Sequence, residues 1–128
     1  MGYCSDIHVI TSVEGFEKMR ECIWKLAEDR KLSDNMVLFP RVGEDPEKFF
    51  HFFEQGGDYI HFGFSSFKWS GFYKDVALFL DMLAEVDEEE VAWSFCRNGQ
   101  DSDDFEIWIS EAEDYDMPCI ELRPVVCW

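Results

Sequence analysis

The sequence predicts an α+β fold in which two helices pack on one face of a mainly antiparallel sheet, an arrangement of the ferredoxin-like type. Two segments repeat apolar residues at helical intervals, and short segments rich in β-branched and aromatic residues lie around them. Two of the later short segments are joined by an Asn-Gly turn signal. With 128 residues, of which 47% are hydrophobic, residues 1–128 fit a single domain with its own core.

The N-terminal part predicts a strand, a helix and a second strand. Residues 6–11 are rich in β-branched side chains and predict a strand near the centre of the sheet. A helix follows over residues 13–30, where apolar residues recur at helical intervals and Thr11 and Glu14 have the spacing of a capping box. Residues 36–40 predict a short strand that ends at a proline.

The next segment has two interpretations. Asp45 as N-cap and Pro46 at the first helical position favour a short helix over residues 47–54, or an irregular turn. The alternative is a hairpin in which residues 49–53 pair with residues 59–64. Residues 59–64 predict a strand in either case.

The remaining elements are a second helix and a hairpin. Residues 72–85 carry apolar side chains on one helical side. Residues 91–97 and 105–110 are apolar or alternating runs, and they predict an antiparallel hairpin. Residues 119–128 could add a last strand at an edge, because Pro124 interrupts them.

The charge of the chain excludes several functional classes. Twenty-eight acidic and eleven basic residues give a net charge of −17, which repels nucleic acid and anionic membranes and attracts basic surfaces. The first residues lack the basic and apolar regions of a signal peptide, and no apolar run is long enough to span a membrane. We therefore expect a cytoplasmic protein that binds neither nucleic acid nor membrane directly.

The sequence contains no recognisable catalytic or cofactor motif. Its five cysteines include no CxxC pair, so we expect them to be reduced. None of His8, His51 and His61 has a second ligand at the close spacing of metal sites, and no phosphate-binding loop is present. We predict no catalytic residue, metal site or cofactor. A small enzyme built around His61 or Cys96 is one alternative.

The acidic residues are concentrated in one segment. Residues 87–116 hold twelve acidic residues and one basic residue, a net charge of −11, whereas residues 1–86 carry −6. Carboxylates on a rigid hairpin can compete for protein surfaces that bind phosphates, while a surface that only confers solubility is the plainer interpretation. The candidate partner-binding residues here are Glu89, Asp101, Asp103, Asp104 and Glu106.

Aromatic residues form a second candidate surface. Phe64, Phe67 and Phe72 lie close in sequence to Trp69 and Tyr73, and the last two are the candidate partner-binding residues. Tryptophan and tyrosine are favoured at protein interfaces. The other interpretation places this cluster in the core, beside the start of the second helix.

The chain also resembles a group of small acidic proteins of bacteriophages and prophages of Gram-positive bacteria. The residues that carry this resemblance are Tyr3, Ser5, Asp6, Ile7, residues 9–12, residues 14–17, residues 59–69, Asp75, Val76, Phe95, Arg97, Gly99, Asp103 and Asp104. They span most of the chain. Cys4 and the aromatic run at residues 49–53 depart from the pattern of the group.

The resemblance implies a context rather than residue roles. Small acidic phage proteins without enzymatic motifs are often inhibitors of host defence, and they include anti-CRISPR proteins. The combined expectation is a non-catalytic inhibitor in the host cytoplasm. Its partner would be a host protein with a basic nucleic-acid-binding surface, such as a CRISPR effector. A regulatory module that binds through the aromatic patch around Trp69 is the alternative.

Overall fold

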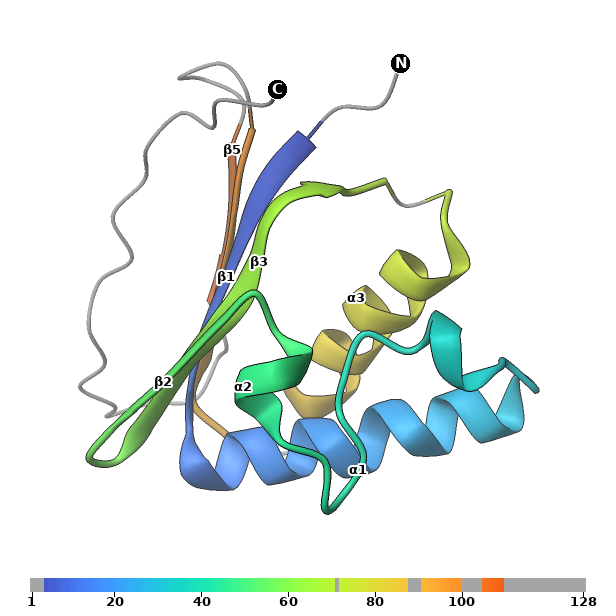
Figure 1. Ribbon diagram of the computed structural model, residues 1–128, viewed down its shortest axis with the longest axis horizontal. Coiled ribbons are helices and arrows are strands. Elements are labelled where there is room, and N and C mark those ends of the chain that lie inside the picture. Colours follow the sequence, from blue (N-terminus) through green and yellow to red (C-terminus); the bar gives the residue numbers. More distant parts are fainter. Residues whose placement is uncertain (1–3, 71, 88–90, 100–104, 110–128) are drawn as a thin grey trace.

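The computed structural model describes residues 4–70, 72–87, 91–99 and 105–109 (Figure 1). They form an α+β fold with a five-stranded antiparallel sheet in the order β2-β3-β1-β4-β5, which confirms the predicted fold class. The strands are β1 (Cys4–Ser12), β2 (Phe52–Gly56), β3 (Tyr59–Lys68), β4 (Trp93–Asn98) and β5 (Phe105–Ile109).

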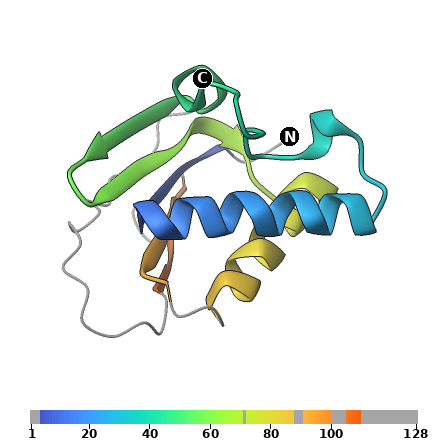
Figure 2. The same cartoon turned by 90° about the horizontal axis from the view of Figure 1, so that it is seen from below.

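The helices lie together on one face of this sheet. The two long helices are α1 (Val13–Asp29) and α3 (Lys74–Asp87), and the short ones are the 3₁₀ helix η1 (Asp34–Met36) and α2 (Pro46–Phe49). Figure 1 shows α1, α2 and α3 on the same side of the strands, and Figure 2 shows α3 next to α1 and crossing it at an angle. The position of the two long helices, α1 and α3, confirms the prediction that two helices pack on one face of the sheet.

Strand β1 is the centre of the sheet. It pairs with β3 on one edge and with β4 on the other. Ile7 and Val9 are fully buried on the face that meets the helices, while His8 between them points to the opposite face and is half-buried. The predicted central position of the first strand is therefore confirmed.

Aromatic rings fill the space between α1 and the sheet. Phe16 on α1 lies 4.9 Å from Phe39 and 5.5 Å from Phe62 of β3, measured between ring centroids. Phe50 completes the cluster at 4.4 Å from Phe62. All four rings are buried, so this cluster carries much of the apolar burial that stabilises the fold.

The start of α1 corrects the predicted cap. The N-cap is Ser12, whose hydroxyl oxygen accepts a hydrogen bond from the Gly15 backbone N–H at 2.9 Å. Thr11 faces the core instead, and its hydroxyl donates to the Ala92 carbonyl oxygen at 2.9 Å. The capping-box prediction placed the cap one residue too early, because the Thr11 side chain is buried and bonded to Ala92, whereas Ser12 directly precedes the helix.

The predicted strand at residues 36–40 is wrong. Val37 and Phe39 are buried in a connection without regular secondary structure that follows η1. The carbonyl oxygen of Pro40 accepts a hydrogen bond from the Trp24 indole N–H at 3.2 Å. The apolar run thus reflects burial of a loop against α1 rather than pairing in the sheet.

Residues 45–57 combine the two interpretations. Asp45 caps α2 by accepting from the Glu47 backbone N–H at 3.0 Å, as predicted, but α2 ends at Phe49. The chain then enters β2, which pairs with β3 through a two-residue connection that contains Gly57 at a φ of +62°. The favoured helix over residues 47–54 is wrong in its extent, and the hairpin alternative is confirmed from Phe52 onward.

The later elements follow the prediction closely. Helix α3 starts at Lys74, two residues after its predicted start, and the antiparallel β4–β5 hairpin is present. The possible strand at residues 119–128 lies outside the described residues.

Cys22 and Cys96 are free thiols, but Cys4 is disulfide-bonded, so the prediction that the cysteines are reduced is wrong for Cys4. Sequence spacing cannot show which cysteines a fold brings together.

Substitution of Gly63 tests how closely β3 packs against its neighbouring strands β1 and β2. A Cβ at this position would lie 1.7 Å from the Ile7 carbonyl oxygen and 2.7 Å from Cζ of Phe52. Because the first contact is with backbone, we expect Gly63→Ala to lower the free energy of unfolding by about 2 kcal/mol or more. Chemical denaturation measures it. Ser65→Ala, at an exposed position of the same strand, is the control, and equal losses would contradict the packing described.

Candidate functional site

Only part of the predicted acidic site falls within the described residues. Glu89, Asp101, Asp103 and Asp104 lie outside them. Glu106 lies on β5, and its side chain is exposed. Its Oε1 is 3.3 Å from Nη2 of Arg97 on β4, so the pair spans the two strands of the hairpin. Glu106 therefore has a structural partner as well as an exposed carboxylate.

The helix-facing side chains hold the hairpin in place. Trp108 of β5 packs edge-on against the buried Trp93 of β4, with 5.1 Å between ring centroids. Arg97 donates through Nη1 to the Ser5 hydroxyl of β1 at 3.1 Å and through Nη2 to Glu106. These contacts tie β5 to β4 and to the central strand, which gives any surface on the hairpin a rigid base.

The register of the hairpin separates the points at which the acidic segments attach. Ile109 pairs with Ser94, and Phe105 pairs with Asn98. Residues 87–90 and 110–116 therefore join the hairpin at one end, and residues 100–104 join it at the other. A five-residue strand spans about 17 Å at about 3.4 Å per residue. The acidic segments are anchored at two ends of a scaffold rather than on one rim.

An apolar row on β5 was missed by the sequence analysis. Phe105, Ile107 and Ile109 lie on the face opposite the helices and are 45%, 55% and 54% exposed. The signal in the sequence is that both alternating sets of this strand contain large apolar side chains. A strand at the edge of an antiparallel sheet needs only one apolar face for the core. The second apolar set therefore forms an apolar surface outside the core between helices and sheet.

The predicted aromatic patch divides into a core part and an exposed part. Trp69 is half-buried and lies 5.6 Å from Phe79 and 5.9 Å from Phe95, measured between ring centroids. Tyr73 is about half exposed, and Phe72 is 99% exposed. Trp69 therefore follows the core interpretation, whereas Phe72 and Tyr73 at the start of α3 are available to a partner.

Two histidines meet on the sheet face opposite the described helices. Nδ1 of His8 on β1 lies 3.0 Å from Nε2 of His61 on β3, so one ring nitrogen donates a hydrogen bond to the other. Burial lowers the pKa of both rings; His61 lowers the pKa of His8 further, and the carboxylates of Asp6 and Glu54 oppose these shifts. The pair is therefore neutral at neutral pH.

The groups proposed for an unrecognised enzyme lie near this pair. Cys96 faces His8 across the β1–β4 register, but the thiol is buried. Burial raises the pKa of Cys96 to about 11, so the nucleophilic thiolate is scarce at neutral pH. Within the described ranges, no three His, Cys, Asp or Glu side chains are grouped so that they could hold a metal ion.

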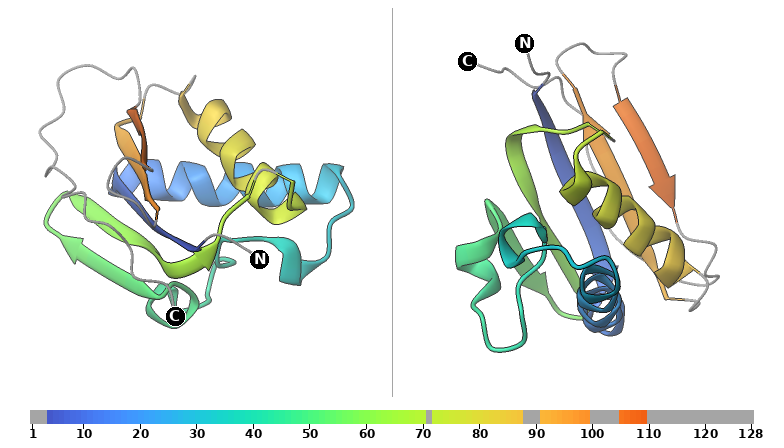
Figure 3. Two further views of the ribbon diagram at one scale, coloured as in Figure 1. Left: turned by 90° about the horizontal axis from the view of Figure 1, so that it is seen from above. Right: turned by 90° about the vertical axis from the view of Figure 1, so that its right-hand side faces the viewer.

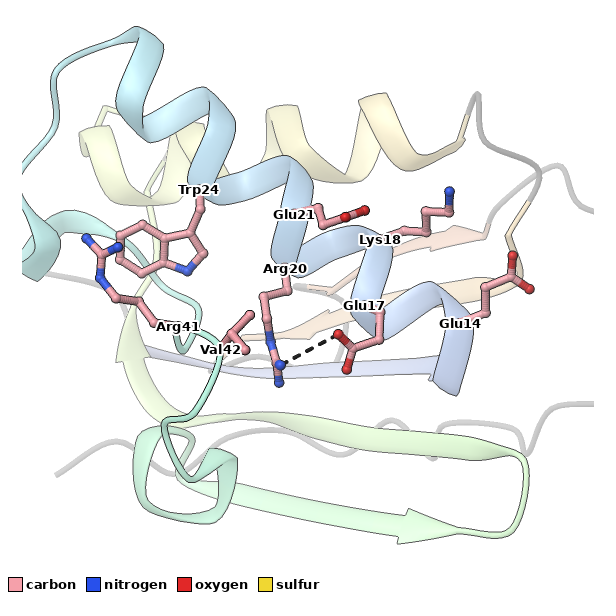
Figure 4. A pocket seen from close by; sticks show the side chains of 8 residues that line it. All are labelled: Glu14, Glu17, Lys18, Arg20, Glu21, Trp24, Arg41 and Val42. Atoms are coloured by element: carbon pink, nitrogen blue, oxygen red, sulfur yellow. Dashed lines mark ion pairs between the residues drawn. The ribbon is translucent and has the colours of Figure 1, made fainter.

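A groove of about 500 Å³ runs along the outer side of α1 (Figure 4). Its walls include Glu17, Arg20 and Trp24 of α1, with Arg41 and Val42 from the loop after Pro40. The Arg41 guanidinium carbon lies 3.8 Å from the centroid of the Trp24 ring, and Arg20 pairs with Glu17 at 3.6 Å. Paired charges of both signs line the groove, so it lacks the one-signed field of the acidic segment.

Comparison with known proteins gives no assignment. No family model, no curated protein and no solved structure matches the chain. Among the described helices, none is both long and apolar enough to cross a membrane.

The histidine pair makes stability depend on pH. The folded-state pKa of each ring is below 6.5, so the unfolded chain binds more protons as the pH falls. The contribution of the pair to stability is complete above pH 6.5 and is lost as the pH falls through the folded-state pKa values. Denaturant unfolding of the wild type should therefore show a lower free energy of unfolding at pH 5.5 than at pH 7.5.

The variant His61→Gln should reduce this pH dependence, because it removes one titrating ring and the repulsion between two protonated rings. His51→Gln changes an exposed histidine and is the matched control. An unchanged slope in His61→Gln between pH 7.5 and pH 5.5 would show that the pair does not govern stability in this range.

Proposed function

We propose that the protein is a non-catalytic inhibitor that binds a nucleic-acid-handling defence protein of the host, such as a CRISPR effector. Its acidic segment occupies the basic surface on which that protein binds nucleic acid, and both proteins meet in the host cytoplasm. The observation that carries this proposal is the net charge of −11 in residues 87–116, a segment built around an ordered hairpin.

The ion pairs of the described arginines support the proposal that the acidic segment binds a basic partner. Arg20, Arg30, Arg41 and Arg97 each lie within 4.0 Å of a carboxylate, at Glu17, Asp81, Asp34 and Glu106 respectively. These pairs place four of the eleven basic side chains next to a carboxylate. By sequence, residues 87–116 hold twelve acidic residues and one basic residue, so the segment has a large acidic excess whatever its local contacts are.

The hairpin also supports a surface that imitates nucleic acid. Trp108 and Arg97 fix β5 on the sheet, and the acidic segments attach at points about 17 Å apart. The two strands between these segments are already paired, so binding does not have to order them. A basic groove shaped for a nucleic-acid backbone could thus contact both acidic ends at once.

Charge reversal tests this proposal. A variant with Glu89, Asp101, Asp103 and Asp104 changed to lysine should lose at least about tenfold in affinity for the host protein that the wild type captures. Glu106 is left unchanged because it pairs with Arg97. Raising the salt from about 50 to about 200 mM should weaken wild-type binding by a similar factor.

The matched control reverses four exposed acidic residues elsewhere, namely Glu21, Glu28, Asp29 and Glu44. It changes the net charge by the same amount, so it separates a defined acidic site from bulk charge. Pull-down followed by titration calorimetry measures both variants. Equal loss in both, or binding that salt leaves unchanged, would contradict the proposal.

A second candidate function is a regulatory module that binds through exposed aromatic residues. Phe72 is 99% exposed next to the half-exposed Tyr73, and phenylalanine and tyrosine are enriched at protein interfaces relative to the rest of the surface. In this case the acidic charge would serve solubility.

A double variant distinguishes this second function. Phe72→Ser with Tyr73→Ser should leave the free energy of unfolding within about 0.5 kcal/mol of the wild type, because both side chains are exposed. Trp69 is kept because it packs on Phe79 and Phe95. If the aromatic surface binds the partner, the double variant loses capture at every salt concentration. Unchanged capture removes this function.

A further inference from the structure

The groove along α1 is bordered by one row of side chains on the helix and by a loop. The right-hand view in Figure 3 looks nearly along α1 and shows α3 on one side of it and the loop that leads to α2 on the other. Phe16, Arg20 and Trp24 are spaced four residues apart, so they form one row along the helix. Phe16 enters the aromatic core, whereas Arg20 and Trp24 line the groove. The row therefore places a guanidinium between the core and the groove.

Arg20 is a largely buried cation in this groove. Its side chain is only 12% exposed, and its guanidinium carbon lies 5.1 Å from the centroid of the Phe16 ring. Its Nη1 lies 3.6 Å from Oε2 of Glu17, which is longer than the ordinary N–H···O distance of about 2.7–3.2 Å. Its Nε is buried and has no hydrogen-bond partner among the described residues. A buried guanidinium is stabilised when acceptors contact its donors, so Arg20 is suited to receive a further acceptor.

The opposite wall of the groove is held in place by contacts around Trp24. The Arg41 guanidinium carbon lies 3.8 Å from the centroid of the Trp24 ring, and the same guanidinium bonds the Asp34 carboxylate. The Trp24 indole N–H donates to the Pro40 carbonyl oxygen at 3.2 Å. Val42 is 80% exposed and adds an aliphatic surface to the groove (Figure 4). The groove thus combines an ordered apolar wall with two guanidinium groups.

We propose that this groove binds a small monocarboxylate with a flat apolar body. The carboxylate bonds the Arg20 guanidinium, and the body lies against Trp24 and Val42. A carboxylate matches the planar fork of donors that a guanidinium presents. The volume of about 500 Å³ is within the range of small-molecule sites. The lining residues all fall within residues 14–42, so the inference is independent of the proposed function of residues 87–116.

The charges around the groove favour a ligand with a single negative charge. The lining includes three acidic and three basic side chains, namely Glu14, Glu17, Glu21, Lys18, Arg20 and Arg41. The glutamates repel the additional charge of a phosphate or a dicarboxylate. The net charge of −17 on the whole chain acts in the same direction. A single carboxylate on Arg20 gains the charge-assisted hydrogen bonds with the least repulsion.

Phenylacetate is the probe, and phenylacetamide is its control, because the amide has nearly the same shape without the charge. NMR titration of the full chain follows the signals of the Trp24 indole N–H and the Arg20 Nε–H. We expect phenylacetate to shift both signals and to bind at least about tenfold more tightly than the amide, since hydrogen bonds to a charged pair are the stronger ones. Inorganic phosphate should bind more weakly than phenylacetate.

Variants of the two arginines on α1 locate the carboxylate. Arg20→Gln should weaken phenylacetate binding by about tenfold or more. Arg30→Gln removes the same charge at the C-cap of the same helix, where Arg30 pairs with Asp81, and should bind like the wild type. Glu17→Gln removes the carboxylate that competes for Arg20, so it should tighten binding by about twofold or more.

A change on the loop wall keeps the test independent of the packing of Arg20 on Phe16. Val42→Glu places a carboxylate in the groove from an 80% exposed position and should weaken phenylacetate binding by about tenfold. Val42→Gln is the uncharged control and should weaken binding much less.

Several results would each overturn the carboxylate site. They are equal binding of phenylacetate and phenylacetamide, a shift of the groove signals with neither, tighter binding of phosphate than of phenylacetate, equal effects of Arg20→Gln and Arg30→Gln, and equal effects of the two Val42 variants. None of these results bears on capture of a host protein by the acidic segment, which is measured with other variants.

Discussion

The structure depends on β1 being paired on both edges and buried on one face. Ile7 and Val9 must be covered, so α1 and α3 gather on that face, and the rings of Phe16, Phe39, Phe50 and Phe62 fill the space between helices and sheet. This requirement places β4 beside β1 and leaves β5 at the edge. The exposed surface of the hairpin is thus a consequence of how the core is built.

Much of this architecture could be predicted, because local patterns that agree with the fold are strong signals. The β-branched run of β1, the helical periodicity of α1 and the Asn98-Gly99 signal each pointed to the observed element. The two wrong predictions of secondary structure have physical causes. Residues 36–40 are apolar because a loop is buried, and residues 45–57 place a cap and a hairpin in immediate succession.

The candidate site was less accessible to prediction. Composition located the acidic segment, but only strand register shows that its parts attach at two ends of the hairpin. The His8–His61 contact joins residues fifty-three positions apart, and no local pattern encodes it. The apolar row of β5 has a local signal, yet its meaning depends on β5 being an edge strand, which is a property of the whole sheet.

The central claim is that the protein occupies a nucleic-acid-binding surface of its partner. Fluorescence anisotropy of a labelled oligonucleotide bound to the captured host protein tests this most directly, with unlabelled protein as the titrant. If the two compete for one surface, the oligonucleotide is displaced fully, and the half-maximal inhibitor concentration rises linearly with the oligonucleotide concentration. A ternary complex, in which the anisotropy stays high or increases at saturation, would contradict it.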